Sequence, residues 1–256
     1  MKQDDRAPFV QALQRARVAA YAPGEFAGQE SFMGAAEILA LARRAGVAPG
    51  VSVLDLCCGI AGPGVLIAHE LGCTYLGVDA SASAIAIARE RARGLRCRFA
   101  VAQIPQLPPG RFDVVFLLET MLAFPDKDSL AREVARALPP GGRFACTVEA
   151  GQPLTHAERE AMPDADTVWL TPLPDLLAGL ERAGLAVRWQ EDCSRAHLAA
   201  AESLAAAFAA DAVAIAALIG DQALEELLAA HRLWIGWLRS GRVRKVAVVA
   251  EKTAAS

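Results

Sequence analysis

A glycine-rich turn beside an acidic residue is the part of the sequence best suited to bind a ligand. The apolar run at residues 51–57 contains Asp55, and Gly59 and Gly62 follow directly behind it. Glycines let the backbone approach a ligand closely, and Pro63 suits the first turn of a helix, where free N–H groups bind polar ligand atoms. Open parallel sheets bind their ligands at such turns.

A second acid, Asp79, lies twenty residues after Gly59 at the end of the next apolar run. A carboxylate at this place can accept hydrogen bonds from both hydroxyls of a ribose. Nicotinamide-dependent dehydrogenases share this pattern and remain an alternative. Two features favour another nucleoside cofactor: the turn lacks a strict G-x-G-x-x-G, and Asp55 is suited to face a cationic amino-acid moiety.

Alternating strands and helices are expected to position these residues. Short apolar runs predict strands at 51–57, 74–78, 96–101, 112–118, 143–149, 185–192 and 242–251. Helical periodicity predicts helices at 63–71, 82–93, 127–138 and 174–184. Such alternation indicates an α/β fold with right-handed βαβ units, and we expect a Rossmann-like, seven-stranded, mostly parallel sheet with helices on both faces.

Two helical additions are expected around this core. The periodicity of residues 9–46 breaks at residues 22–24, which predicts a leading helix and a second helix at 31–45. Alanine-rich amphipathic stretches to about residue 219 and at 222–238 predict a helical lid inserted before the last strand. We therefore divide the chain into an N-terminal helical cap at 1–50, a core at 51–195 plus 241–256, and a lid at 196–240.

Four stretches in this order resemble the motifs of class I S-adenosylmethionine-dependent methyltransferases. They are the turn in VLDLCCGIAGPG, the strand end LGVDAS, the strand FDVVFLLETM, and the turn LPPGGRF. Cys57 and Ala61 stand where the family usually has glycine, and Gln103 stands where it usually has an aspartate that contacts the adenine. More loosely, the cap and lid resemble a subgroup that includes sarcosine N-methyltransferases and prenyl-diphosphate C-methyltransferases.

The resemblance implies S-adenosylmethionine as cofactor and assigns residues to it. Tyr21, Gln29 and Met33 are expected to close over the cofactor from the cap. The full predicted cofactor set is Tyr21, Gln29, Met33, Asp55, Cys57, Gly59, Gly62, Asp79, Ala80, Gln103, Ile104 and Leu118.

Methyl transfer from a sulfonium is an in-line displacement, so the protein must chiefly align the acceptor in a dry site. Glu119, at the end of the fourth strand, is the candidate base, with a site-lining acid as the alternative. The resemblance to prenyl-diphosphate C-methyltransferases implies a glutamate at this position. Phe26, Trp169, His197 and Trp234 are the candidate acceptor contacts, although Trp234 also fits a helix core.

The composition limits the possible partners. Net charge is −3 without a basic stripe, which argues against nucleic acid, and no apolar run reaches the ~20 residues needed to span a membrane. Two early aspartates argue against a secretory signal, so we expect a cytoplasmic protein. The six cysteines form no C-x-x-C pair, and we expect no metal.

The lid, rich in Ala, Leu and Trp, favours a small apolar or aromatic acceptor of secondary metabolism, and its apolar face leaves a homodimer possible. The alternative function is a protein that binds adenosylmethionine without transferring its methyl group.

Overall fold

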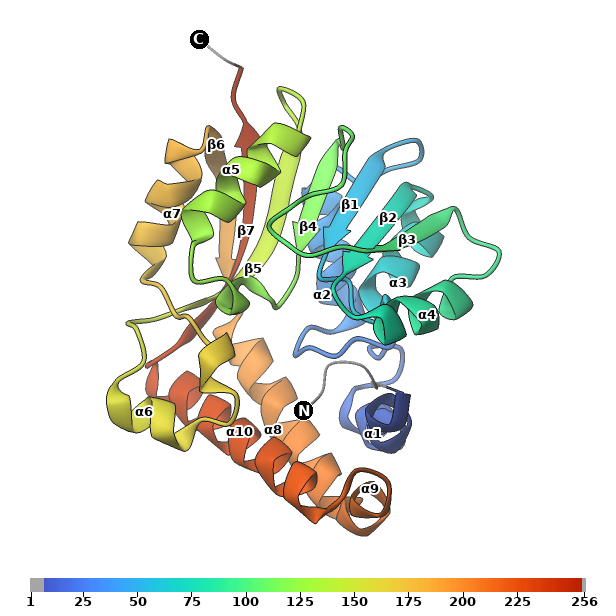
Figure 1. Cartoon of the computed structure of the whole chain (residues 1–256), viewed down its shortest axis with the longest axis vertical. Helices are drawn as coiled ribbons and strands as arrows, with labels where there is room; N and C mark the ends of the chain where they lie inside the picture. Colours follow the sequence, from blue (N-terminus) through green and yellow to red (C-terminus); the bar gives the residue numbers. More distant parts are fainter. Residues whose placement is uncertain (1–6, 255–256) are drawn as a thin grey trace.

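The computed structural model describes residues 7–254 and has a seven-stranded sheet at its centre (Figure 1). The strand order is β3-β2-β1-β4-β5-β7-β6, and β7 is antiparallel to both its neighbours. This arrangement confirms the predicted fold class. The strands are β1 (Ser52–Leu56), β2 (Thr74–Asp79), β3 (Cys97–Val101), β4 (Val114–Leu117), β5 (Arg143–Ala150), β6 (Leu185–Asp192) and β7 (Arg244–Lys252).

Two layers of helices cover the sheet because its central strands alternate apolar side chains between the two faces. In β1, Val53 packs toward the layer of α2 (Ala35–Arg44), α3 (Gly62–Leu71) and α4 (Ala82–Arg91). Leu54 and Leu56 pack toward α5 (Lys127–Ala137) and α7 (Leu173–Arg182). Because β1, β2, β3 and β4 pair in parallel, they end at one common edge of the sheet.

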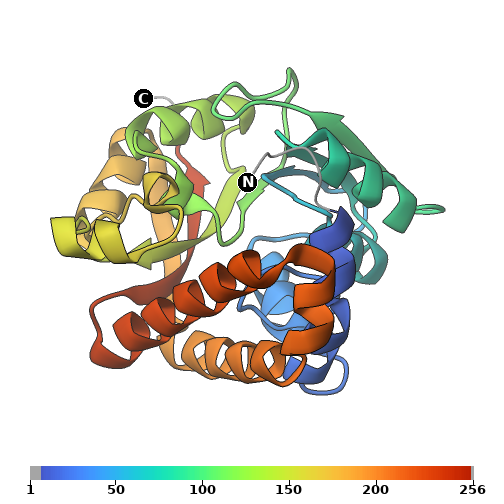
Figure 2. The same cartoon turned by 60° about the horizontal axis from the view of Figure 1, so that its bottom comes forward.

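Four further helices gather below that edge (Figure 1). They are α1 (Ala7–Ala20), α8 (Ser194–Ala210), α9 (Ala212–Ile219) and α10 (Asp221–Ser240), and they share a core that includes Leu13, Phe208 and Ile215. Figure 2 shows α8 and α10 running side by side, with α9 and α1 at one end. The three helices α8 to α10 lie between β6 and β7 in the chain, and we call them the lid helices.

Some predicted boundaries differ from the structure. The helix expected from residue 31 begins at Ala35, because Gly34 before it has extended backbone and residues 31–34 form part of a loop. The helix α6 (His156–Ala161) was not predicted, although Thr155 and Glu158 form a capping box whose T-x-x-E signature is readable in the sequence.

Among the described residues, no single helix is both long and apolar enough to cross a membrane. The bent pair α8 and α9, which meet at 80°, passes that test by length and composition alone.

Candidate active site

The turn after β1 contains two residues in strained backbone conformations. Cys57 and Ala61 have φ values of 57° and 59°, close to the 53° of Gly59 between them. Left-handed conformations cost residues with a Cβ atom about 1–2 kcal/mol, and such strain concentrates at functional sites. Gly62 has a different role, since a Cβ there would lie 2.2 Å from the backbone oxygen of Gly28. The loop from α1 to α2 therefore packs directly on this turn.

Asp79 is held in place at the end of β2 by two backbone donors. The N–H of Gly59 donates to its Oδ2 atom at 2.9 Å, and the N–H of Ser81 donates to Oδ1 at 2.9 Å. The Ser81 side chain in turn caps α4. The Asp79 carboxylate lines a cavity with lone pairs to spare, as a ribose-binding acid must.

Asp55 is buried at the bottom of the same turn and accepts a hydrogen bond from the Tyr75 hydroxyl. Burial raises the pKa of Asp55 to about 7, although the Tyr75 hydrogen bond acts in the opposite direction. An ammonium group placed beside Asp55 would supply the missing counter-charge and favour the ionised carboxylate. The acid is thus suited to the cationic amino-acid end of a ligand.

These residues surround a cavity of about 240 Å³, which we call the cofactor cavity. Six of the twelve predicted cofactor residues line it: Asp55, Cys57, Gly59, Gly62, Asp79 and Leu118. The other lining residues are Gly28, Glu30, Ser31, Cys58, Ile60, Pro63, Glu119 and Thr120. Two acids, a backbone turn with close approach and a helix N-terminus fit the ribose and amino-acid parts of S-adenosylmethionine.

The other six predicted cofactor residues do not line this cavity. Met33 is a buried core residue, because it belongs to the loop that packs under α2. Gln29 is buried and uses its side chain within the loop, where its amide donates to the backbone oxygens of Glu25 and Met33. Tyr21 donates to the backbone oxygen of Ser31.

The loop from the cap does reach the cofactor cavity, but through Gly28, Glu30 and Ser31. On the adenine side, Ala80 and Gln103 are exposed and Ile104 is half-buried. None of these three lines the cavity, and their contact with the cofactor stays a prediction.

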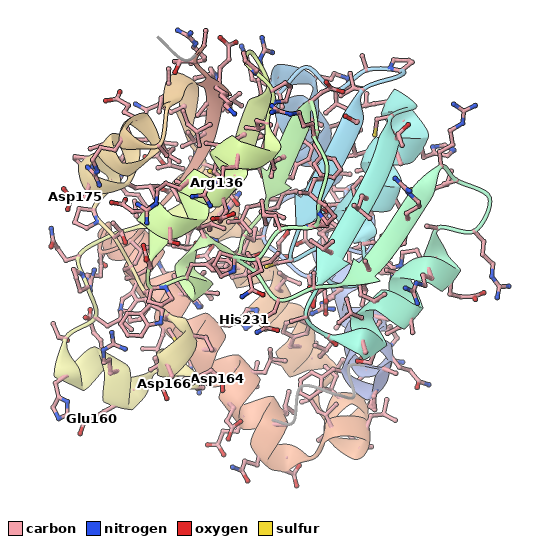
Figure 3. All side chains as sticks on the ribbon, turned by 45° about the horizontal axis from the view of Figure 1, so that its top comes forward. Arg136, Glu160, Asp164, Asp166, Asp175 and His231 are labelled. Atoms are coloured by element: carbon pink, nitrogen blue, oxygen red, sulfur yellow. The ribbon has the colours of Figure 1, made fainter. Side chains whose placement is uncertain are left out.

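A second cavity of about 340 Å³ lies between the sheet edge and the lid helices, and we call it the acceptor cavity. Its walls are mostly apolar, from Phe32, Leu122, Met162, Val168, Leu204, Phe208, Leu227 and Trp234. His231 of α10, labelled in Figure 3, lies in this wall with its ring 5.2 Å from the ring of Phe208. Tyr21 and Gln29 line this cavity instead of the first.

Glu119 lies where the two cavities meet, since Glu30, Ser31 and Glu119 line both. It lies two residues after the end of β4 at Leu117 and has a φ of 57°. Its backbone N–H donates to the Thr147 hydroxyl at 2.6 Å, which fixes this unusual turn. The candidate base is therefore placed between the expected cofactor and any acceptor.

A buried group of charges surrounds Glu119. Lys245 of β7 donates to Glu119 Oε2 at 2.8 Å and to Glu149 Oε1 at 2.5 Å. Burial acts to raise the pKa of Glu119, but the charges of Lys245 and His197 outweigh it and lower that pKa to about 2. Burial raises the pKa of Glu149, and the neighbouring Glu119 charge raises it further. Lys245 acts in the opposite direction without cancelling these effects.

Sequence analysis assigned neither Lys245 nor Glu149 to the site. The structure adds both, because β5 and β7 pair antiparallel with Glu149 directly opposite Lys245. Both side chains are almost fully buried, at 0% and 4% exposure. The available signal was a lysine and a glutamate near the ends of two apolar strands. That pattern does not show which strands pair.

Of the four predicted acceptor contacts, Trp234 lines the acceptor cavity. Phe26 packs against Tyr21 behind the wall, with ring centroids 5.7 Å apart. Trp169 stacks on Arg159 near the surface and is 38% exposed. His197 is completely buried behind Glu119 and does not reach the cavity wall. The structure thus places three of the four predicted contacts away from the cavity.

One group of side chains carries donors of the kinds that bind metals. Glu37, Cys193 and His197 place ligand atoms within 4.8 Å of one another. However, Nε2 of His197 and Oε1 of Glu37 are 2.8 Å apart, a hydrogen-bond distance. Two ligands bound at about 2.0 Å to one tetrahedral zinc ion lie about 3.3 Å apart. The arrangement is that of a hydrogen bond.

Comparison with known proteins supports the family suggested by the motifs. Residues 53–142 match the family model described as a methyltransferase domain. The match agrees with the resemblance of the motifs to class I S-adenosylmethionine-dependent methyltransferases. It supports the predicted family, enzyme class and cofactor for this part of the chain. It includes the turn after β1, Asp79 and Glu119.

Two curated methyltransferases are similar to part of the chain. Methyltransferase GfsG from Streptomyces halstedii is 39% identical over 111 residues, which are 41% of this chain and 40% of the relative. Cycloartenol-C-24-methyltransferase from Arabidopsis thaliana is 30% identical over 171 residues, covering 60% of this chain and 50% of the relative. The chain therefore spans half or less of these relatives' lengths.

Among solved structures, the [4+2]-cyclase SpnF matches with a TM-score of 0.78 at 22% identity. The match covers 98% of this chain and 94% of the other, so the fold with its lid helices is shared.

Proposed function

We propose that the protein transfers a methyl group from S-adenosylmethionine to a small apolar or aromatic molecule bound in the acceptor cavity. The observation that carries this proposal is the meeting of two cavities at Glu119. One cavity has the acids and the backbone turn of the cofactor site, and the other has mostly apolar walls. Their common wall is where a methyl group would pass.

S-adenosylmethionine supplies an electrophilic methyl group whose transfer leaves a neutral thioether. Asp79 holds the ribose, and Asp55 neutralises the amino group. The loop at residues 28–32 and the lid helices keep water from the reacting atoms, which preserves alignment and prevents hydrolysis.

Glu119 then takes the proton that an acceptor hydroxyl, amine or acidic carbon loses. A carboxylate with a pKa near 2 is a weak base, yet an oxygen or nitrogen that is being methylated becomes strongly acidic. Lys245 keeps Glu119 ionised and ready to accept. Trp234 and Phe32 lie with their rings 5.9 and 5.2 Å from Lys245 Nζ and complete the wall beside it.

A second function is favoured by one comparison. The [4+2]-cyclase SpnF shares the fold along almost the whole chain, and the acceptor cavity, with its mostly apolar walls, is suited to hold a flexible apolar substrate. The alternative is therefore a protein that binds adenosylmethionine and catalyses a rearrangement without methyl transfer.

Tritium-labelled S-adenosylmethionine separates these functions. The purified protein is incubated with the labelled cofactor and a panel of apolar phenols, alcohols and amines, and extracted products are counted. Methyl transfer predicts labelled product that falls by about 100-fold or more in Glu119→Gln. Label that stays on the cofactor with every acceptor, in protein that binds S-adenosylhomocysteine, would favour the alternative.

A further inference from the structure

His197 is a fully buried histidine whose two ring nitrogens face carboxylates on opposite sides. Nε2 lies 2.8 Å from Oε1 of Glu37, and Nδ1 lies 3.6 Å from Oε1 of Glu119. Both Nδ1 of His197 and Oε1 of Glu119 are buried without a hydrogen-bond partner within residues 7–254. Buried polar atoms are rarely left unpaired without a reason. A proton between these two atoms would pair both.

Glu37 connects this histidine to a third cavity. It lies in the first turn of α2 with its side chain 24% exposed, and it lines a cavity of about 670 Å³ between α2, β6 and α8. We call this the outer cavity, and Arg44, Trp189 and Cys193 also line it. Glu119, His197 and Glu37 thus form a row from the acceptor cavity to the outer cavity.

We propose that His197 and Glu37 form a proton path that carries the proton released at Glu119 to the outer cavity. The inference rests on the proposed methyl transfer. In that reaction the acceptor atom bonds to the methyl carbon, the carbon–sulfur bond breaks with its electron pair left on sulfur, and the acceptor's proton moves to Glu119. It passes next to Nδ1 of His197 while Nε2 gives its proton to Glu37, and Glu37 releases it to water.

The charges around the histidine favour the first step, from Glu119 to His197. Burial lowers the pKa of His197, but the Glu119 charge and the Glu37 hydrogen bond outweigh it, and the pKa lies above its ordinary value. Lys245 of β7 acts in the opposite direction, and Cys193, one turn earlier at the start of α8, faces Glu37. Since Glu119 has a pKa of about 2, a proton is more stable on His197 than on Glu119.

The first test uses the protein without any acceptor. Long-range ¹H–¹⁵N NMR follows the rings of the four histidines between pH 5 and 9, and His197→Gln identifies the signal of His197. The path predicts a neutral form with its proton on Nε2, and a titrating Nδ1 whose pKa falls in Glu119→Gln and in Glu37→Gln. A neutral form with its proton on Nδ1, or a pKa unchanged in both variants, would overturn the proposal.

The second test uses the acceptor found with labelled adenosylmethionine. We expect kcat to fall about 100-fold in His197→Gln with little change in KM, and imidazole to restore part of it. The rising limb of the pH profile should disappear in this variant, whereas the exposed His69→Gln should keep both rate and profile. Because His197 is buried, Glu37→Gln provides a milder variant that should shift the limb to lower pH.

The two proposals can fail separately. If no acceptor receives label, the proposed function fails while the NMR titration still tests the row of side chains. If label is transferred at the wild-type rate by folded His197→Gln, the proton path alone is wrong.

Discussion

Nζ of Lys245 lies 2.8 Å from Glu119 and 2.5 Å from Glu149, so that one buried cation joins two buried carboxylates at the wall of the acceptor cavity. Lys245 and Glu149 belong to β7 and β5, and Glu119 lies two residues after β4; the three strands are neighbours that meet at the lower edge of the sheet (Figure 1). The charge group therefore links the stability of the sheet to the chemistry of the site.

Replacing Lys245 should lower the free energy of unfolding. Lys245→Met leaves two buried carboxylates without their cation, and removing one partner of a buried pair costs about 3–5 kcal/mol. The double variant Lys245→Met with Glu149→Gln should recover part of this loss. Urea unfolding measures both, and Arg182→Met, which breaks an exposed pair with Asp128, should cost less than about 1 kcal/mol. A loss that small for Lys245→Met would mean that the carboxylates are not ionised together.

The strained turn after β1 predicts a stabilising substitution. Cys57→Gly should raise the free energy of unfolding by about 1 kcal/mol, since glycine adopts its φ of 57° without the Cβ penalty. The matched variant Cys97→Gly in β3 should lower that energy by about 0.5–1 kcal/mol, because strand backbone suits residues with a side chain. If both variants lose stability alike, the turn is not strained.

Asp55 predicts that ligand binding depends on pH. Its folded pKa, near 7, lies above the ordinary value of 3.8, so its contribution to stability is complete below pH 3.8 and is lost as pH rises through 7. The ammonium group of S-adenosylhomocysteine requires the ionised form of Asp55. Below pH 7, binding should therefore release a proton, and the affinity should fall by up to about tenfold for each unit by which the pH is lowered. Calorimetry in buffers of different ionisation enthalpy counts the proton.

Asp55→Asn serves as the control for this titration. The amide cannot ionise, so proton release should vanish and the affinity should become low and nearly independent of pH. Proton release that persists in Asp55→Asn would assign the titration to another group.

Residues whose position depends only on the end of one strand could be predicted from the sequence. Asp79 and Glu119 follow apolar runs, and parallel strands bring such positions to one edge of the sheet. Lys245 could not be placed in this way, because its burial depends on the pairing of β5 with β7. The same limit applies to His197, since only the packing of α8 against α2 places Glu37 beside it.

The loop between α1 and α2 shows a finer limit. Resemblance selected Tyr21, Gln29 and Met33 as cofactor contacts, whereas the loop after α1 lines the cofactor cavity through other residues. Alternate residues of an irregular loop point in different directions, and no periodicity gives that direction in advance. Gly28, Glu30 and Ser31 face the cofactor cavity as a result.

Calorimetric titration with S-adenosylhomocysteine tests the central claim most directly. The wild-type protein should bind with micromolar affinity, and Asp79→Ala should lose that binding while the exposed Asp175→Asn on α7, labelled in Figure 3, keeps it. Absence of binding by folded wild-type protein, or unchanged affinity in Asp79→Ala, would contradict the assignment of the turn after β1 and Asp79 to the cofactor.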